Sequence, residues 1–331
     1  MQLPGVSPRR CRRRPARLLA ACLPATVAAA LLAGCGGTSS SPQNLPTVSG
    51  AVGEQAAITI PHGLTAPTSV ASSVLVQGNG SQLANGDAVV VNYTLMDWTG
   101  AKLIGSTYST GKGPNKTQEF VLGSSTALPS WNQVLPHVTI GSRVEIVTPP
   151  AGAFGSGGAT AYGITGKDDL IYVLDVVGAY PGTADITGTM PAQTADPTLP
   201  TVHGNPGTTP TITIPAGAAA PTTAKSKVLI QGSGAQITAD QRLMVQYVGV
   251  DWNTGRQFDS SFAQKQIASF VFGSSTVISG WNTGLAGKHV GDRVLLVIPA
   301  TQAYGSKGVP SAGIHGGDTL VFVVDIVDAL S

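Results

Sequence analysis

The second half of the chain carries a group of aromatic residues together with one aspartate. The group consists of Tyr247, Phe258, Asp259, Phe270, Trp281, Tyr304 and Phe322. If the fold brings them together, they form an apolar, water-poor cup with a few polar groups at its rim, which needs no nucleophile or metal ion to act on a bound group. Taken alone, each aromatic residue fits a core position equally well, and the aspartate fits a turn cap.

Other chemistries find little support in the sequence. The five histidines show no i, i+4 pairing and no glutamate companion of the kind that zinc hydrolases use, so we expect no metal. There is no G-x-S-x-G elbow and no phosphate-binding loop, and we expect no cofactor. The glycine-rich run Gly155-Ser156-Gly157-Gly158 precedes no convincing helix and is interpreted as a loop.

The amino terminus has the pattern of a bacterial lipoprotein signal peptide. Six arginines precede an uncharged run from Leu18 to Gly34, which is short for a membrane span. The run ends in a Leu-Ala-Gly-Cys lipobox, so residues 1–34 are predicted to be removed and Cys35 to be lipidated. The alternatives are an ordinary signal peptide cut near an Ala-x-Ala site and an uncleaved anchor. We therefore expect an extracytoplasmic protein, anchored to the cell membrane by lipidated Cys35.

Removal of this leader changes the charge balance. Of the 19 basic residues, six lie in the leader, which leaves 13 against 17 acidic residues and a net charge of about −4. No basic patch with interleaved aromatic residues remains, and we expect no binding to nucleic acid. Cys11 and Cys22 leave with the leader, which excludes an intramolecular disulfide.

Two low-complexity stretches divide the rest of the chain. Residues 35–50 begin with small polar residues that cannot bury enough apolar area to fold, and they are interpreted as a flexible tether. Residues 182–210, rich in Pro, Thr and Gly, are interpreted as a linker between two domains, at 51–181 and 211–331.

The two predicted domains are copies of one another. Val74-Leu75-Val76-Gln77-Gly78 recurs 154 residues later as Val228-Leu229-Ile230-Gln231-Gly232. Phe120-Val121-Leu122-Gly123 recurs 150 residues later as Phe270-Val271-Phe272-Gly273, so the first copy carries about four extra residues between these motifs.

The apolar pattern within each copy is mostly that of strands. Leu243, Val245 and Tyr247 alternate with their neighbours, and one short helix is expected to begin near Trp281, with a counterpart near Trp131. The predicted fold class is therefore α+β, with two tandem domains that each wrap an antiparallel β-sheet around one short α-helix.

A series of short motifs runs through the second copy in a fixed order. They are Val245-Gln246-Tyr247, Gly255 to Ser261, Phe270-Val271-Phe272-Gly273, Val277 to Trp281, Gly291-Asp292-Arg293, Ala303-Tyr304-Gly305 and Leu320-Val321-Phe322. Each motif alone is weak, but their order and spacing are specific. With them the second copy resembles the FKBP-type peptidyl-prolyl cis/trans isomerases along its whole length, and the two copies are FKBP-like domains.

The resemblance implies roles for ten residues. It implies that Trp281 is the floor under a proline ring, and that the Ile278 backbone N–H and the Tyr304 hydroxyl bind substrate carbonyls. Asp259 supplies a buried polar contact at the rim, and Ile314 lies on the flap. The implied catalytic residues are Tyr247, Phe258, Asp259 and Tyr304, and the implied substrate-binding residues are Phe270, Val277, Ile278, Trp281, Ile314 and Phe322. Where the family usually has phenylalanine, the chain has Ala268, so one wall is expected to be more open.

The first copy keeps the aromatic positions but loses the polar ones. Leu103-Ile104 is expected to replace Phe258-Asp259, and Phe154 to replace Tyr304, which removes the carboxylate and the hydroxyl together. Tyr93, Phe120, Trp131 and Tyr172 stand where Tyr247, Phe270, Trp281 and Phe322 stand. The hypothesis is a degenerate domain with weak or no isomerase activity that binds chain segments or acts as a spacer.

Two functions stay open at this point. The first is a peptidyl-prolyl cis/trans isomerase that acts on proline-containing polypeptides and folding intermediates of exported proteins, mainly through its C-terminal domain. The second is a non-catalytic extracytoplasmic chaperone, binding or scaffold module that holds partners in the same cups. The retained polar residues Tyr247, Asp259 and Tyr304 favour the enzyme. Binding of the macrolide inhibitors known for the family is a further expectation.

Overall fold

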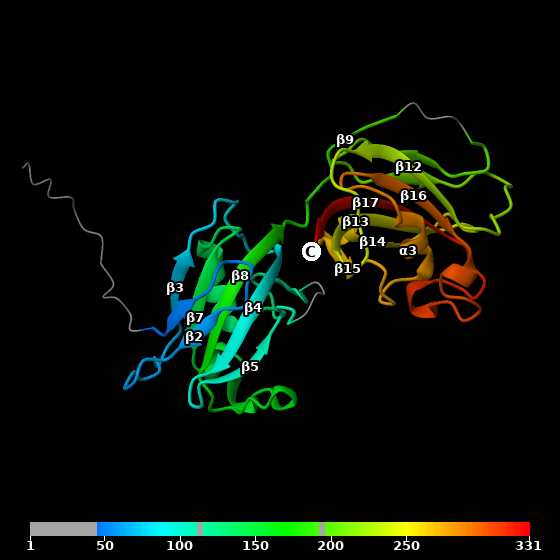
Figure 1. The fold of residues 1–331 in the computed structure, drawn as a ribbon. Helices are drawn as coiled ribbons and strands as arrows, with labels where there is room; N and C mark the ends of the chain where they lie inside the picture. The colour runs from blue at the N-terminus through cyan, green and yellow to red at the C-terminus, as the bar shows by residue number, and fades with distance from the viewer. Residues whose placement is uncertain (1–44, 111–114, 192–195) are drawn as a thin grey trace, which may run out of the picture. The chain divides into compact units, whose positions relative to one another are not determined.

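The computed structural model of the protein describes residues 45–110, 115–191 and 196–331. These residues form two β-rich domains (Figure 1). The predicted signal peptide and the predicted lipidation site at Cys35 lie outside them. In the part of the chain that is described, no helix is both long and apolar enough to cross a membrane.

The N-terminal domain is a sheet of antiparallel strands. Its strands are β3 (Ala71–Val76), β4 (Ala88–Asp97), β5 (Lys102–Ser106), β6 (Gln118–Val121), β7 (Arg143–Thr148) and β8 (Leu170–Tyr180). The order across the sheet is β3-β7-β8-β4-β5. Strand β6 pairs with the first half of β4, and β5 pairs with its second half. The short helix α1 (Pro129–Val134) packs near β7.

The C-terminal domain repeats this arrangement (Figure 1, yellow to red). Its strands are β9 (Gly188–Thr189), β12 (Lys225–Gly232), β13 (Arg242–Asp251), β14 (Gln257–Ser260), β15 (Ala268–Val271), β16 (Arg293–Ile298) and β17 (Leu320–Leu330). The order is β14-β13-β17-β16-β12-β9, with β15 paired to β13. Helix α3 (Ser279–Leu285) is the predicted one. A second helix of one turn, α2 (Ser261–Gln264), follows β14 and was not predicted.

The α+β prediction of two tandem domains is therefore confirmed, and parts of the low-complexity stretches also have regular structure. A two-stranded hairpin precedes each sheet: β1 (Thr47–Ser49) with β2 (Ala57–Thr59), and β10 (Thr201–His203) with β11 (Thr211–Thr213). Strand β1 falls in the stretch interpreted as a tether. Strands β9 and β10 fall in the stretch interpreted as a linker, and β9 extends the second sheet by pairing with β12.

The central strands of the C-terminal sheet are buried on both faces. Along β16, Val294, Leu296 and Ile298 belong to the core under α3, whereas Leu295 and Val297 belong to a second apolar cluster on the outer face. Val202 and Ile212 of the β10–β11 hairpin pack against that outer cluster. Each fully buried side chain of this kind stabilises the fold by about 1.5 to 3 kcal/mol, so both faces hold the sheet rigid under the cup.

A buried arginine holds each hairpin to its sheet. In the C-terminal domain, Nε of Arg293 lies 2.6 Å from Oδ1 of Asp325, and both side chains are about 1% exposed. The remaining guanidinium N–H groups donate to the carbonyls of Gly204, Asn205 and Thr208, in the loop that joins β10 to β11. In the N-terminal domain, Arg143 pairs with Asp175 in the same way and donates to the carbonyls of Gly50 and Glu54. All the charged groups are thus satisfied without water.

Candidate functional site

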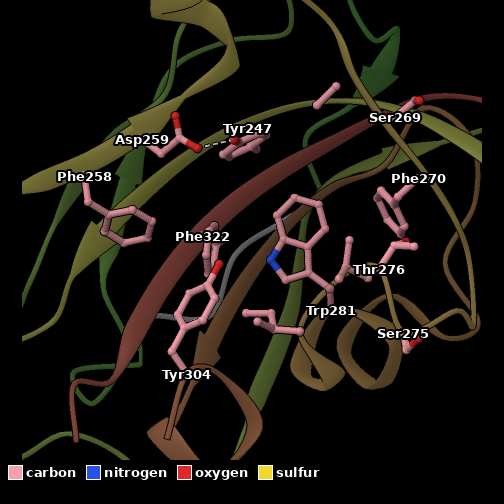
Figure 2. A pocket seen from close by; sticks show the side chains of 13 residues that line it. Tyr247, Phe258, Asp259, Ser269, Phe270, Ser275, Thr276, Trp281, Tyr304 and Phe322 are labelled. Atoms are coloured by element: carbon pink, nitrogen blue, oxygen red, sulfur yellow. Dashed lines mark hydrogen bonds between the residues drawn. The ribbon is translucent and has the colours of Figure 1, made fainter. Parts of the chain in front are cut away.

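A cavity of about 390 Å³ lies in the C-terminal domain, next to α3 and the strands of the sheet that face it (Figure 2). We call it the C-terminal cup. Its lining residues are Tyr247, Phe258, Asp259, Ala268, Ser269, Phe270, Ser275, Thr276, Val277, Ile278, Trp281, Tyr304 and Phe322. Asp259 is the one charged side chain in this set, so the cup combines aromatic and aliphatic walls with several hydroxyl groups and a single carboxylate.

Trp281 is the floor of the cup. Figure 2 shows its indole at the centre of the group, with Phe270 on one side and Phe322 on the other. The ring centroid of Trp281 lies 5.4 Å from that of Tyr247 and 5.3 Å from those of Phe270 and Phe322, and all three pairs meet edge to face. Edge-to-face packing is the favoured geometry of aromatic pairs. The indole is therefore fixed from three sides before any ligand binds.

Two glycines of α3 allow Trp281 to lie this deep. A Cβ atom at Gly280 would lie 2.3 Å from Cγ2 of Ile298, and one at Gly284 would lie 2.5 Å from Cδ2 of Leu296. Such distances are much shorter than a van der Waals contact. The helix can therefore pack this close to β16 only because Gly280 and Gly284 have no side chain. In the N-terminal domain Ser130 replaces Gly280, and the smaller Thr148 replaces Ile298.

A β-bulge turns Phe258 and Asp259 to the same cavity. Gly249 of β13 pairs with Asp259, and the next residue, Val250, pairs with Gln257, so Phe258 is the extra residue on β14. In a regular strand two consecutive side chains point to opposite faces, whereas a bulge redirects one of them. Gly249 leaves room for the redirected ring, because a Cβ atom there would lie 2.6 Å from Cζ of Phe258.

The carboxylate of Asp259 is held by three donors. The phenol of Tyr247 donates to Oδ2, and the side-chain amide of Gln264 donates to Oδ1 at 2.7 Å. The backbone N–H of Ser260 also donates to Oδ1, at 2.8 Å. These contacts fix the plane of the carboxylate at the rim.

Tyr304 supplies the other polar side chain of the rim. It is 41% exposed and takes no part in the hydrogen bond between Tyr247 and Asp259. Burial, and then the negative charge of Asp259, raises the pKa of its phenol. Burial, and then the hydrogen bond to Asp259, also raises the pKa of Tyr247. Both phenols therefore stay protonated at neutral pH and act as donors.

A backbone donor completes the site. Ile278 immediately precedes α3 and has an extended conformation, with φ −60° and ψ 143°. Its carbonyl accepts the N–H of Trp281 at 3.0 Å, whereas its own N–H, at the position that caps the helix, has no acceptor within the helix and is directed to a ligand carbonyl in this interpretation. The site thus combines an aromatic floor, a fixed carboxylate, a phenol and a backbone N–H.

Nine of the ten residues predicted from the sequence line this cup, and one does not. Ile314 is 3% exposed and belongs to the same core cluster as Trp281 and Phe322. It therefore lies in the core next to the site and does not line the cavity. Ala268 lines one wall, as expected. The cup is also lined by Ser269, Ser275 and Thr276, which were not predicted. The repeated Gly-Ser-Ser-Thr run after the Phe270 motif was the signal that could have identified the last two.

The N-terminal domain has a smaller cavity at the corresponding place, of about 210 Å³. It is lined by Tyr93, Leu95, Gln118, Thr126, Leu128, Trp131, Phe154, Tyr162, Ile164 and Tyr172. We call it the N-terminal cup. It has no charged side chain, and its floor is Trp131, which meets Tyr172 edge to face at 5.3 Å.

The sequence comparison of the two cups was wrong by one residue. Gly105 pairs with Leu95, as Asp259 pairs with Gly249, and Leu103 pairs with Met96, as Gln257 pairs with Val250. Ile104 therefore occupies the place of Phe258, and Gly105 that of Asp259, whereas Leu103 points away and is 47% exposed. The error arose because the bulge breaks the alternation of the strand, which the sequence pattern alone does not show. The carboxylate is still absent from this cup.

No metal centre is formed by the described residues. Between residues 45 and 331, apart from the two undescribed gaps, no three His, Cys, Asp or Glu side chains come together as ligands.

The sequence matches the family described as FKBP-type peptidyl-prolyl cis-trans isomerase at residues 80–177 and 234–327, one segment in each domain. It is 46% identical over 81 residues to an FK506-binding protein of Streptomyces anulatus, which covers 24% of this chain and 65% of the relative. It is also 41% identical over 85 residues to the peptidyl-prolyl cis-trans isomerase FPR2 of Saccharomyces cerevisiae, covering 26% of this chain and 62% of the relative. The chain thus spans less than two thirds of the length of these relatives. Because the two matched segments make up more than half of its length, the chain belongs to the FKBP-type peptidyl-prolyl cis-trans isomerase family.

Proposed function

We propose that the protein is a peptidyl-prolyl cis/trans isomerase and that the C-terminal cup carries the activity. The observation that supports this proposal is the fixed Tyr247–Asp259 pair at the rim of a cup with Trp281 as its floor. The isomerisation of an X-Pro bond needs no covalent step, since the peptide bond is twisted and not cut. Its barrier of about 18 to 20 kcal/mol comes from the loss of amide resonance.

The cup is suited to lower that barrier. The planar amide is stabilised by a resonance form with separated charges. A space walled by Trp281, Phe258 and Phe322 solvates separated charges poorly. The free energy of the twisted amide is therefore lowered relative to that of the planar amide. The N–H of Ile278 and the phenol of Tyr304 are the donors for the carbonyls on either side of the proline ring. Each reduction of about 1.4 kcal/mol in the barrier raises the rate tenfold.

The N-terminal cup is proposed to hold proline-containing segments without isomerising them at a comparable rate. It keeps Tyr93, Trp131 and Tyr172, but Gly105 and Phe154 stand in place of the carboxylate and the second phenol. Leu128 has the same extended conformation before α1 as Ile278 has before α3, with φ −63° and ψ 147°. A backbone donor for a peptide carbonyl is thus retained where the side-chain groups are lost.

The proposed substrates are exported proteins. The support is the leader sequence with its lipobox at Cys35, which would place both domains outside the cytoplasm and next to the membrane. Macrolide ligands of the family are proposed to bind in the C-terminal cup. The alternative function, a non-catalytic module that only holds its partners, fits the N-terminal cup, which lacks the carboxylate and the second phenol. It does not fit the C-terminal cup, which has both.

The test is a proline-isomerisation assay on the soluble chain from residue 36 onward. The wild type is compared with a double variant, Asp259→Gly with Tyr304→Phe, which gives the C-terminal cup the polar groups of the N-terminal one. We expect the rate to fall by about a hundredfold. Each of the two lost groups removes one hydrogen bond worth about 1.4 kcal/mol in the transition state, and each such loss lowers the rate about tenfold. The matched control is Phe154→Leu, at the position of Tyr304 in the first domain. If the double variant keeps the wild-type rate, or if Phe154→Leu lowers the rate as much, the assignment to the C-terminal cup is wrong.

A further inference from the structure

The charge of Asp259 is balanced by no cation. Its three hydrogen-bond donors, the Tyr247 phenol, the Gln264 amide and the Ser260 N–H, are all neutral. Among the described residues, no lysine, arginine or histidine nitrogen forms an ion pair with it. The carboxylates of Asp175 and Asp325, by contrast, are each neutralised by a buried arginine.

Gln264 is the donor that comes from outside the sheet. It lies in α2, a helix of one turn that begins at Ser261. The helix is capped by the Ser260 hydroxyl, which accepts the N–H of Ala263 at 3.2 Å. The turn ends at Lys265, in a left-handed conformation with φ +54°. This single turn brings the side chain of Gln264 back to Oδ1 of Asp259, while Tyr247 from β13 takes Oδ2. The carboxylate is clamped between two elements.

We propose that Gln264 is a positioning residue for Asp259, and that the uncompensated carboxylate makes the C-terminal cup prefer a cationic residue next to the proline over an acidic one. The inference rests on the proposed isomerase function. Asp259 is the one charged group among the lining residues. Its field therefore acts on the chain segment that enters the cup without being cancelled by a neighbour. A neutral clamp keeps that field, whereas an arginine or lysine at position 264 would remove it.

The size of the effect follows from Coulomb's law. A unit charge on the substrate about 7 Å from the partly buried carboxylate of Asp259, at an effective dielectric constant of about 40, gives about a sevenfold preference for a cation over a neutral residue and about the same factor against an anion. Salt screens exposed charges with a Debye length of about 8 Å at 0.15 M and about 3 Å at 1 M, so the preference must shrink as salt is added. A purely steric preference would not change with salt.

The experiment measures kcat/KM of the soluble chain from residue 36 onward on three blocked peptides that differ only before the proline, with lysine, glutamine or glutamate. At low salt we expect the lysine peptide to exceed the glutamate peptide by about tenfold or more, and the ratio to fall toward one at 1 M salt. In Gln264→Arg the ratio is expected to fall close to one at low salt, and in Asp259→Asn likewise. In Gln264→Glu, which adds a second negative charge beside the first, the ratio is expected to rise.

The matched control is Gln266→Arg. Gln266 is exposed in the same segment, and its backbone N–H donates to the Ser261 carbonyl at 3.2 Å, so the substitution adds the same charge near the cup without the contact to Asp259. It is expected to keep most of the lysine-to-glutamate ratio. A wild-type ratio near one, or equal loss of the ratio in Gln264→Arg and Gln266→Arg, overturns the inference while leaving the isomerase function intact. No turnover of any of the three peptides would overturn the proposed function itself, and the inference with it.

Discussion

The phenol of Tyr247 donates a hydrogen bond to the carboxylate of Asp259, whereas Tyr93, at the same place in the N-terminal domain, has Gly105 where the aspartate would be. The two domains therefore share a tyrosine whose surroundings differ by one carboxylate. This pair of positions offers a test in which each domain is the control for the other.

Tyr247→Phe is expected to lower kcat/KM for an X-Pro peptide by about tenfold. The substitution keeps the aromatic wall and removes one hydrogen bond to a charged group, which is worth on the order of 1 to 2 kcal/mol. Tyr93→Phe is the matched change and is expected to leave the rate within twofold of the wild type. The rates are measured by proline-isomerisation kinetics on the soluble chain. Equal effects of the two substitutions would contradict the assignment of the site to the C-terminal domain.

Gly280→Ser is expected to destabilise the C-terminal domain by about 1 to 3 kcal/mol, because the added atoms collide with Ile298. Ile298→Thr reproduces the partner that Ser130 has in the N-terminal domain. Introduced together, the two substitutions are expected to cost less than the sum of the single effects, with a coupling energy of about 1 kcal/mol. Urea unfolding followed through the NMR signal of the Trp281 indole gives the four free energies. A coupling energy of zero would mean that α3 does not need the glycine to approach β16.

Much of the fold and the cup could be predicted from the sequence. The internal repeat and the ordered motifs identify the family and the tandem arrangement, both of which are confirmed. The resemblance to the family identifies nine of the residues that line the cup, six of them aromatic. Aromatic positions are predictable because the same side chains form the core and the walls of the cup.

The rest depends on backbone geometry and on long-range contacts. The bulge at Phe258 changes which way two consecutive side chains point, and a two-residue period cannot reveal it. Arg293 reaches the hairpin loop at Gly204, 89 residues away, and no local pattern links these two positions. Ile314 was expected on the flap, and its apolar character fits a buried core position just as well.

The buried carboxyl group of Glu145 makes the stability of the N-terminal domain depend on pH. Glu145 lies on β7, is 1% exposed, and among the described residues its Oε1 has no hydrogen-bond partner; the C-terminal domain has Leu295 at the same position. Burial raises the pKa of Glu145 to about 7, from an ordinary value near 4.3 in the unfolded chain. The folded state therefore binds the proton more tightly, and stability falls as the pH rises from about 4.5 through 7.

Glu145→Gln is expected to remove this dependence. The variant should be more stable than the wild type by about 3 to 4 kcal/mol at pH 8 and close to it at pH 4.5, because the amide stays neutral at both values. Urea unfolding of the N-terminal domain at the two pH values gives the comparison. A constant difference between the variant and the wild type across this range would show that the carboxyl group has the same pKa in the folded and in the unfolded chain, which would contradict the raised pKa.

Arg293→Met is expected to destabilise the C-terminal domain by about 3 to 5 kcal/mol and to release its hairpin. The substitution leaves the carboxylate of Asp325 buried without its cation, which costs more than the loss of the attraction alone. It also removes the donors to Gly204 and Thr208, so the loop between β10 and β11 should become sensitive to limited proteolysis.

The matched variant Arg293→Met with Asp325→Leu separates these two effects. It removes the stranded charge as well, and replacing a whole buried ion pair by apolar side chains of similar volume is often close to neutral, so most of the unfolding free energy should return. The donors to the hairpin loop remain absent, and its sensitivity to protease should therefore persist. If the double variant regains both stability and protection, the hairpin is held by the apolar contacts of Val202 and Ile212, and Arg293 serves the charge of Asp325 alone.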